Sequence, residues 1–194
     1  STNGKAGSIR VTVGAGNTEV GGRITVFAGQ STVSSGGGIA VASGYGTATS
    51  SGVVSLVSDD AGDSGVSGAL TFQSGTTSAG NSGAVLVTTG AATAGKGGSI
   101  TLAVGSGNTA DGGNVSIEAG ETTADSSAGG MVGIRAGFGS HAAGGKGGAI
   151  EVHGGEGTSI SGGAIEVHSG YGSATSSGSI TVHTVGAGDN GVSG

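Results

Sequence analysis

Two apolar positions, separated by one residue, recur along the chain at nearly regular intervals. Aligned on this pair, the sequence divides into twelve units with the consensus x-I-x-V-x-x-G-x-G-x-x-x-x-G-G, and positions within a unit are numbered from its first residue. The 15-residue units begin at Ser8, Arg23, Gly38, Ala69, Ala84, Ser99, Ala149 and Ala164. The units that begin at Val53 and Ser179 are longer by a single residue, that at Asn114 by two and that at Met131 by three.

Both apolar positions are filled without exception. Position 2 holds Ile9, Ile24, Ile39, Val54, Leu70, Val85, Ile100, Val115, Val132, Ile150, Ile165 and Ile180. Position 4 holds Val11, Val26, Val41, Leu56, Phe72, Val87, Leu102, Ile117, Ile134, Val152, Val167 and Val182. A spacing of two places both side chains on one face of an extended segment, and β-branched residues favour that conformation. Because the run is short and bounded by Gly, which disfavours helix, each unit predicts one β-strand.

A third recurrent position is polar and follows the strand. It holds Asn17, Thr32, Thr47, Ser78, Thr93, Asn108, Thr123, Ser140, Thr158 and Ser173, to which Asp63 and Asp189 are added if the extra residue of the 16-residue units precedes it. Such side chains bond neighbouring backbone groups at turns, and the flanking glycines permit close approach of the chain. The sequence therefore predicts a turn in each unit.

One such strand cannot bury its own apolar face, so stacking of the repeats is expected. The prediction is an all-β fold, a parallel β-solenoid of twelve repeats, with residues 1–7 as the tail of a preceding repeat and 8–194 as a single array. A coil of 15 residues would give twelve layers, about 58 Å in all, and a coil of 30 residues six layers, about 29 Å. An antiparallel meander is the alternative outside this class. Since neither end of the sequence resembles a polar cap, we expect a longer array or end-to-end self-association.

The motif G-G-x-I-x-V-x-x-G, over Ser8 to Gly194, resembles the Gly-rich β-solenoid repeats of extracellular fibre and adhesin-type proteins. These include haemagglutinin-like bacterial adhesins and repeat proteins of algal or protist surfaces. The resemblance is to a class of architecture, and it implies a structural role outside the cell.

Composition narrows the range of functions. Gly accounts for 49 of 194 residues, Pro and Cys are absent, and the net charge is −6. With only 6 Lys and Arg residues, the chain lacks the basic footprint of a nucleic-acid-binding protein. No apolar run approaches the length of a membrane span, and the lack of Cys excludes disulfides and thiolate metal sites.

The string AIEVH occurs twice and SITVH once, which spaces His153, His168 and His183 at equal intervals. In a 15-residue coil the three would stack about 4.8 Å apart, whereas in a 30-residue coil only His153 and His183 would be neighbours. Glu151 and Glu166 could pair with these side chains in either case. The favoured interpretation is a solvated ladder rather than a metal site, since an exposed face offers no pocket.

Two further features are candidates for chemistry. Asp59, Asp60 and Asp63 cluster in one unit and Asp189 lies in a matching unit, but the spacing is not that of an EF-hand, so a polar turn is expected. The single Asn-x-Ser/Thr sequon predicts N-glycosylation at Asn114.

We find no set of nucleophile, base and orienting residue, and expect no catalytic, cofactor or metal site. The predicted function is a structural extracellular fibre, stalk or adhesin segment, a rigid repeat scaffold that assembles end to end and carries glycans. The alternative is a module that presents a repetitive face to ice or carbohydrate. Neither a nucleic-acid partner nor a membrane span is expected.

Overall fold

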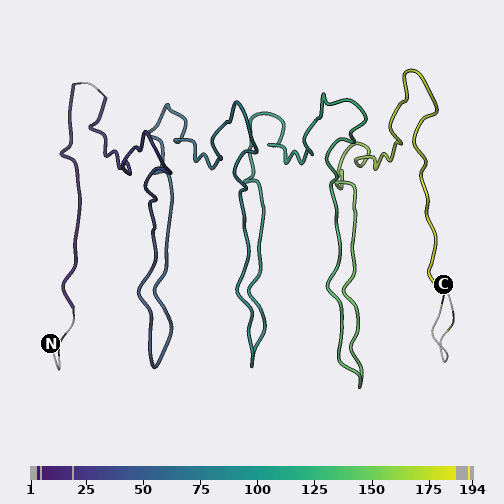
Figure 1. The fold of residues 1–194 in the computed structure, drawn as a ribbon, viewed down its shortest axis with the longest axis horizontal. Coiled ribbons are helices and arrows are strands. Elements are labelled where there is room, and N and C mark those ends of the chain that lie inside the picture. Colours follow the sequence, from purple (N-terminus) through teal and green to yellow (C-terminus); the bar gives the residue numbers. More distant parts are fainter. Residues whose placement is uncertain (1–3, 5, 19, 187–191, 193–194) are drawn as a thin grey trace. The chain divides into compact units, whose positions relative to one another are not determined.

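The computed structural model describes residues 4, 6–18, 20–186 and 192. Within these residues there is no helix and no strand, and the chain runs out and back in narrow hairpins (Figure 1). The prediction of an all-β fold built as a parallel β-solenoid, with either a 15-residue or a 30-residue coil, is therefore wrong for the described part of the chain.

The solenoid fails because no stacked layer covers the apolar positions. None of the described residues is buried, and in the second unit Ile24 is 55% and Val26 69% exposed. Each extended segment contributes only two apolar residues and is flanked by glycines, which lose the most conformational freedom on ordering. A segment of this kind gains too little area within its own chain to hold neighbouring units in a hydrogen-bonded ladder.

The backbone instead pairs within single units. In six of the described units the N–H of the last Gly donates to the C=O of the Gly at position 7, and the unit closes on itself. The bonds are Gly37 to Gly29 (2.9 Å), Gly52 to Gly44 (3.0 Å), Gly130 to Gly120 (2.8 Å), Gly148 to Gly137 (3.0 Å), Gly163 to Gly155 (2.9 Å) and Gly178 to Gly170 (2.9 Å). We call positions 1–6 of a unit its arm and the part from position 7 to the last Gly its closed loop.

In the units that make the closing bond, a Cβ built on the last glycine would lie 3.0 to 3.5 Å from its nearest neighbour, and Gly130 is the tightest of them. A Cβ built on Gly130 would lie 3.0 Å from the Gly120 nitrogen and 3.2 Å from the Ala119 Cβ, whereas a Cβ on Gly120 would meet nothing within 4 Å. The repeat pattern agrees with this asymmetry. The last position is Gly in every unit, but position 7 also accepts Asp59 and Val185.

Position 6 limits where the backbone bond can form. In every unit that makes the bond, position 6 is small, namely Ala28, Ser43, Ala119, Ala136, Gly154 or Ser169. In two other units position 6 is Val13 or Val104, and its Cγ1 occupies the space beside the last Gly. In a third, the Thr89 hydroxyl donates to the Gly98 carbonyl at 3.2 Å. In these three units a β-branched side chain at position 6 thus lies beside the last Gly, where the other six have the backbone bond. A small residue at position 6 is not sufficient for the bond, since the units with Ser58 and Ser74 do not show it.

Extra residues are taken up inside the closed loops. The loops of the two longest units end on bonds of 2.8 Å at Gly130 and 3.0 Å at Gly148, like those of the 15-residue units. Their tips use left-handed backbone, with φ of 58° at Ser126 and 126° at Gly144. Gly144 adopts this conformation easily because it has no Cβ, whereas Ser126 adopts it at a cost of about 1 kcal/mol.

The predicted turn is confirmed in the 15-residue units. The chain bends at positions 10–12, beginning at the third recurrent position, which is polar, as at 32–34, 47–49 and 173–175. Where a side chain bonds the backbone of such a turn, however, the acceptor comes one position earlier, as at Ser31.

The chain forms two compact parts, Ser1–Ile100 and Thr101–Gly194. Each contains arms and closed loops of the same kind. The assignment of residues 1–7 to a preceding repeat and of 8–194 to one array stays a prediction.

Candidate functional site

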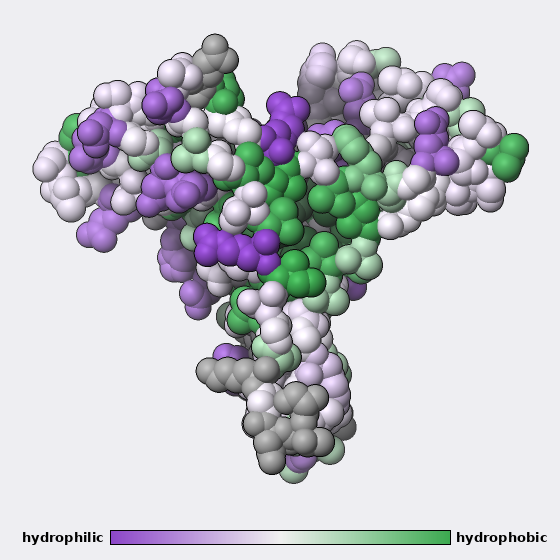
Figure 2. Space-filling view, turned by 90° about the vertical axis from the view of Figure 1, so that its left-hand side faces the viewer, coloured by the Kyte–Doolittle hydropathy of each residue, from purple (hydrophilic) through white to green (hydrophobic). Residues whose placement is uncertain are grey.

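The arms present a repeated apolar surface. From the second unit to the last, position 2 is between 50% exposed, at Val132, and 61% exposed, at Val85, and position 4 is more open still. On the face seen in Figure 2, apolar side chains, in green, are visible among small and polar side chains. We call the set of residues at positions 2 and 4 the apolar columns. They are the largest recurrent chemical feature of the described residues.

Side chains at positions 3 and 5 of an arm meet each other. The Glu151 Oε2 lies 3.7 Å from the His153 Nε2, and the Glu166 Oε2 lies 3.4 Å from the His168 Nε2. In a third arm the Ser116 hydroxyl donates to the Glu118 Oε1 at 3.1 Å. Contacts between residues two apart require the same side of an extended chain, so the alternation predicted from the sequence is confirmed here.

His153 and His168 take part in local pairs with Glu151 and Glu166, as the sequence allowed. His153 and His168 each face the Glu of their own arm, and all four side chains are at least 75% exposed. Both stacking arrangements considered for His153, His168 and His183 depended on solenoid layers, which the described residues do not form. Ion pairs this open are screened by water and contribute at most a fraction of a kcal/mol.

The acidic cluster forms a turn. Asp59 Oδ1 accepts from the Asp60 N–H at 3.0 Å, and the Gly65 N–H donates to the Gly62 carbonyl at 3.4 Å. Asp63 lies on this turn, and Asp189 lies outside the described residues. Throughout the described part of the chain, no three His, Asp or Glu residues are grouped so that they could hold a metal ion.

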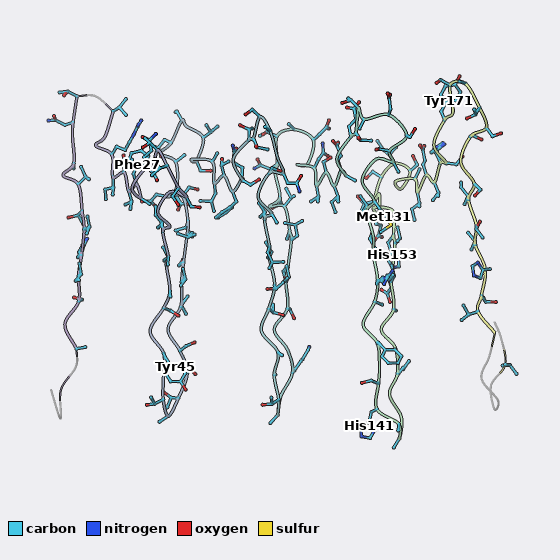
Figure 3. The ribbon with its side chains drawn as sticks, viewed as in Figure 1. Phe27, Tyr45, Met131, His141, His153 and Tyr171 are labelled. Atoms are coloured by element: carbon cyan, nitrogen blue, oxygen red, sulfur yellow. The ribbon has the colours of Figure 1, made fainter. Side chains whose placement is uncertain are left out.

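The loop tips are closed by short-range bonds. Ser31 Oγ accepts from the Ser34 N–H at 3.0 Å, and Thr122 Oγ1 from the Ala124 N–H at 3.3 Å. The His141 Nδ1 accepts from the Ala143 N–H at 3.2 Å near the end of its hairpin (Figure 3). Tyr45 also lies near the end of a hairpin (Figure 3), and its ring is exposed.

The predicted glycosylation site is accessible. Asn114 is exposed on an extended arm, next to Val115 of the apolar columns. The hydroxyl of Ser116, the third residue of the sequon, faces Glu118. Attachment of a glycan at Asn114 stays a prediction.

Sequence reasoning missed the bond between the last Gly and position 7, and the close approach of the position 6 side chain to that Gly. The signal was present, since position 6 holds only Gly, Ala, Ser, Thr or Val and the last position only Gly. A small residue opposite a Gly permits the close approach of two chain segments.

Comparison of the sequence with protein-family models found no match, and neither did comparison with curated proteins or with solved structures. The resemblance to fibre and adhesin repeats accordingly stays a prediction. Among the described residues no helix is long and apolar enough to cross a membrane.

Proposed function

We propose that the chain is a structural repeat segment of an extracellular fibre, stalk or adhesin. The observation that carries this proposal is the regular exposure of the apolar columns along the array. An apolar surface that repeats in every unit suits a protein that makes many equivalent contacts.

The closed loops support the same role. They carry mostly Gly, Ser, Thr and Ala. In the two longest units the extra residues lie inside the loop, so the arm has the same length as in the 15-residue units. The role is mechanical, and the loops give the array a hydrated, weakly charged surface. Subunits assemble end to end into filaments, and Asn114 carries a glycan.

Electron microscopy of the chain at rising concentration tests the fibre. We expect filaments, and compact particles that make no end-to-end contacts at any concentration would contradict it. Thermal hysteresis or selective binding to a glycan array, without filaments, would favour a module that binds ice or carbohydrate.

The glycan is tested separately. Secretion from a eukaryotic host should give a chain heavier than its sequence mass, and Asn114→Gln should remove the difference. A secreted chain at its bare sequence mass would contradict glycosylation at this residue.

A further inference from the structure

We infer that the apolar columns are a docking surface for a second copy of this chain. The inference rests on the proposed structural role and goes further, because it names the surface and the partner.

The first argument is the exposed area. The chain exposes 19060 Å². A compact monomer of 17.5 kDa exposes about 7,900 Å², and a fully unfolded chain of that mass about 25,000 Å². The single copy is thus closer to the unfolded limit, with about 11,000 Å² more than a self-sufficient domain leaves open.

The second argument is the area of the columns themselves. Burying one fully exposed aliphatic side chain removes about 60–120 Å² from water. With both positions of twelve units at least half exposed, the columns offer about 900–1,800 Å² per copy. A stable interface needs about 800 Å² from each partner, so the columns suffice without the loops.

The third argument identifies the occupant. A partner that covers the columns must carry apolar residues at the same recurrent spacing, and a second copy does so at every unit. The closed loops absorb the extra residues of the long units, since the closing bonds at Gly130 and Gly148 match those of shorter units. Differences in unit length therefore do not change the length of the arms.

Electrostatics do not oppose the pairing. The net charge of −6 is spread over 194 residues, and in two arms the Glu lies beside a His. Repulsion between two copies is weak at this charge density and is screened at physiological salt.

The test compares two triple variants of the whole chain by sedimentation over a wide concentration range. One replaces column residues (Ile24→Ser, Ile39→Ser, Ile100→Ser), and the matched control replaces loop residues (Val20→Ser, Val33→Ser, Val66→Ser). We expect the column variant to associate about 100-fold more weakly and the control to stay within about 2-fold of the parent chain.

A second measurement does not depend on altered association. Because the chain has no Cys, one introduced thiol carries a polarity-sensitive dye without background. Dye at Val152→Cys, in the columns, should shift to the blue as concentration rises, and dye at Ile160→Cys, in a loop, should not. Equal behaviour of the two positions would overturn the docking surface.

The outcomes separate this inference from the proposed function. Filaments that form equally well in the column variant would overturn the docking surface and leave the fibre standing. Small oligomers that depend on the columns, without filaments, would support the docking surface and contradict the fibre. A parent chain that stays monomeric throughout would overturn the docking surface.

Discussion

The closed loop of a unit is held by a backbone bond within the unit, whereas the apolar side chains of its arm are left partly exposed. In the second unit the loop closes on its own bond between Gly37 and Gly29, while its Val33 remains 95% exposed. The arm makes no such bond in this unit, yet its Ile24 is shielded to almost half. The loop is satisfied by residues eight positions apart, whereas the arm is left with apolar area that its own unit cannot cover.

This contrast teaches that backbone pairing and apolar burial are separate tasks in this chain. Glycine permits the first at short range, because it removes the side chain that would hold two segments apart. The second needs partner atoms from further away, because two apolar residues per unit are too few to make a core.

The largest difference between arm and loop is expected when a charge is placed in each of them in turn. Val26→Asp should weaken self-association about 10-fold or more, since a carboxylate in the columns would lose hydration on docking. Val33→Asp, in the loop of the same unit, should change association by less than about 2-fold. Light scattering against concentration measures both, and similar effects would mean that arms and loops are equally involved.

The next largest effect is expected when a methyl group is added at one end of a loop's closing bond. Gly130→Ala should open its loop, because the new Cβ meets the Gly120 nitrogen at 3.0 Å. Loss of a bond of about 1 kcal/mol predicts about 5-fold faster hydrogen exchange at the residue 130 amide. Gly120→Ala, whose Cβ meets nothing within 4 Å, is the control and should leave that exchange rate nearly unchanged. Equal acceleration in both variants would show that the packing at Gly130 does not matter.

A pair of opposite substitutions at position 6 sharpens the rule that small residues allow closure. Ala28→Val should speed exchange of the Gly37 amide about 3- to 5-fold, because the larger side chain takes the space beside it. Val104→Ala should slow exchange at Gly113, where the Val104 Cγ1 now lies at 2.7 Å from a built Cβ. Exchange rates that do not respond in opposite directions would contradict the rule.

The smallest effect is expected from the ion pairs of the arms. Glu166→Gln removes the partner of His168 but should change self-association by less than about 2-fold, because the pair is exposed to water. Sedimentation at low and high salt measures this, with Glu156→Gln in a loop as the comparison. A large, salt-sensitive loss confined to Glu166→Gln would place the pair inside an interface.

Sequence periodicity predicted local geometry well. The alternation of sides is confirmed by the contact of Glu151 with His153, and the turn by the bends that begin at Thr32 and Thr47. Both depend on residues close in sequence, where backbone geometry alone fixes which side chains meet.

Stacking could not be predicted in the same way. A repeat shows that units are alike, but not that unit n pairs with unit n+1. Pairing depends on whether the apolar area buried between units outweighs the conformational entropy lost on ordering them. The bond from Gly163 to Gly155 instead joins two glycines of the same unit. For the candidate site, the sequence indicated the apolar columns, but not that they stay open.

Because each closed loop begins and ends on one backbone bond, residues can be added inside it without changing the neighbouring arms. A segment inserted between Gly137 and Gly148 lengthens an excursion while the arms on either side keep their own length. The tip around 142–144 is consequently a natural position for grafting a foreign peptide, displayed away from the arms without resetting the repeat.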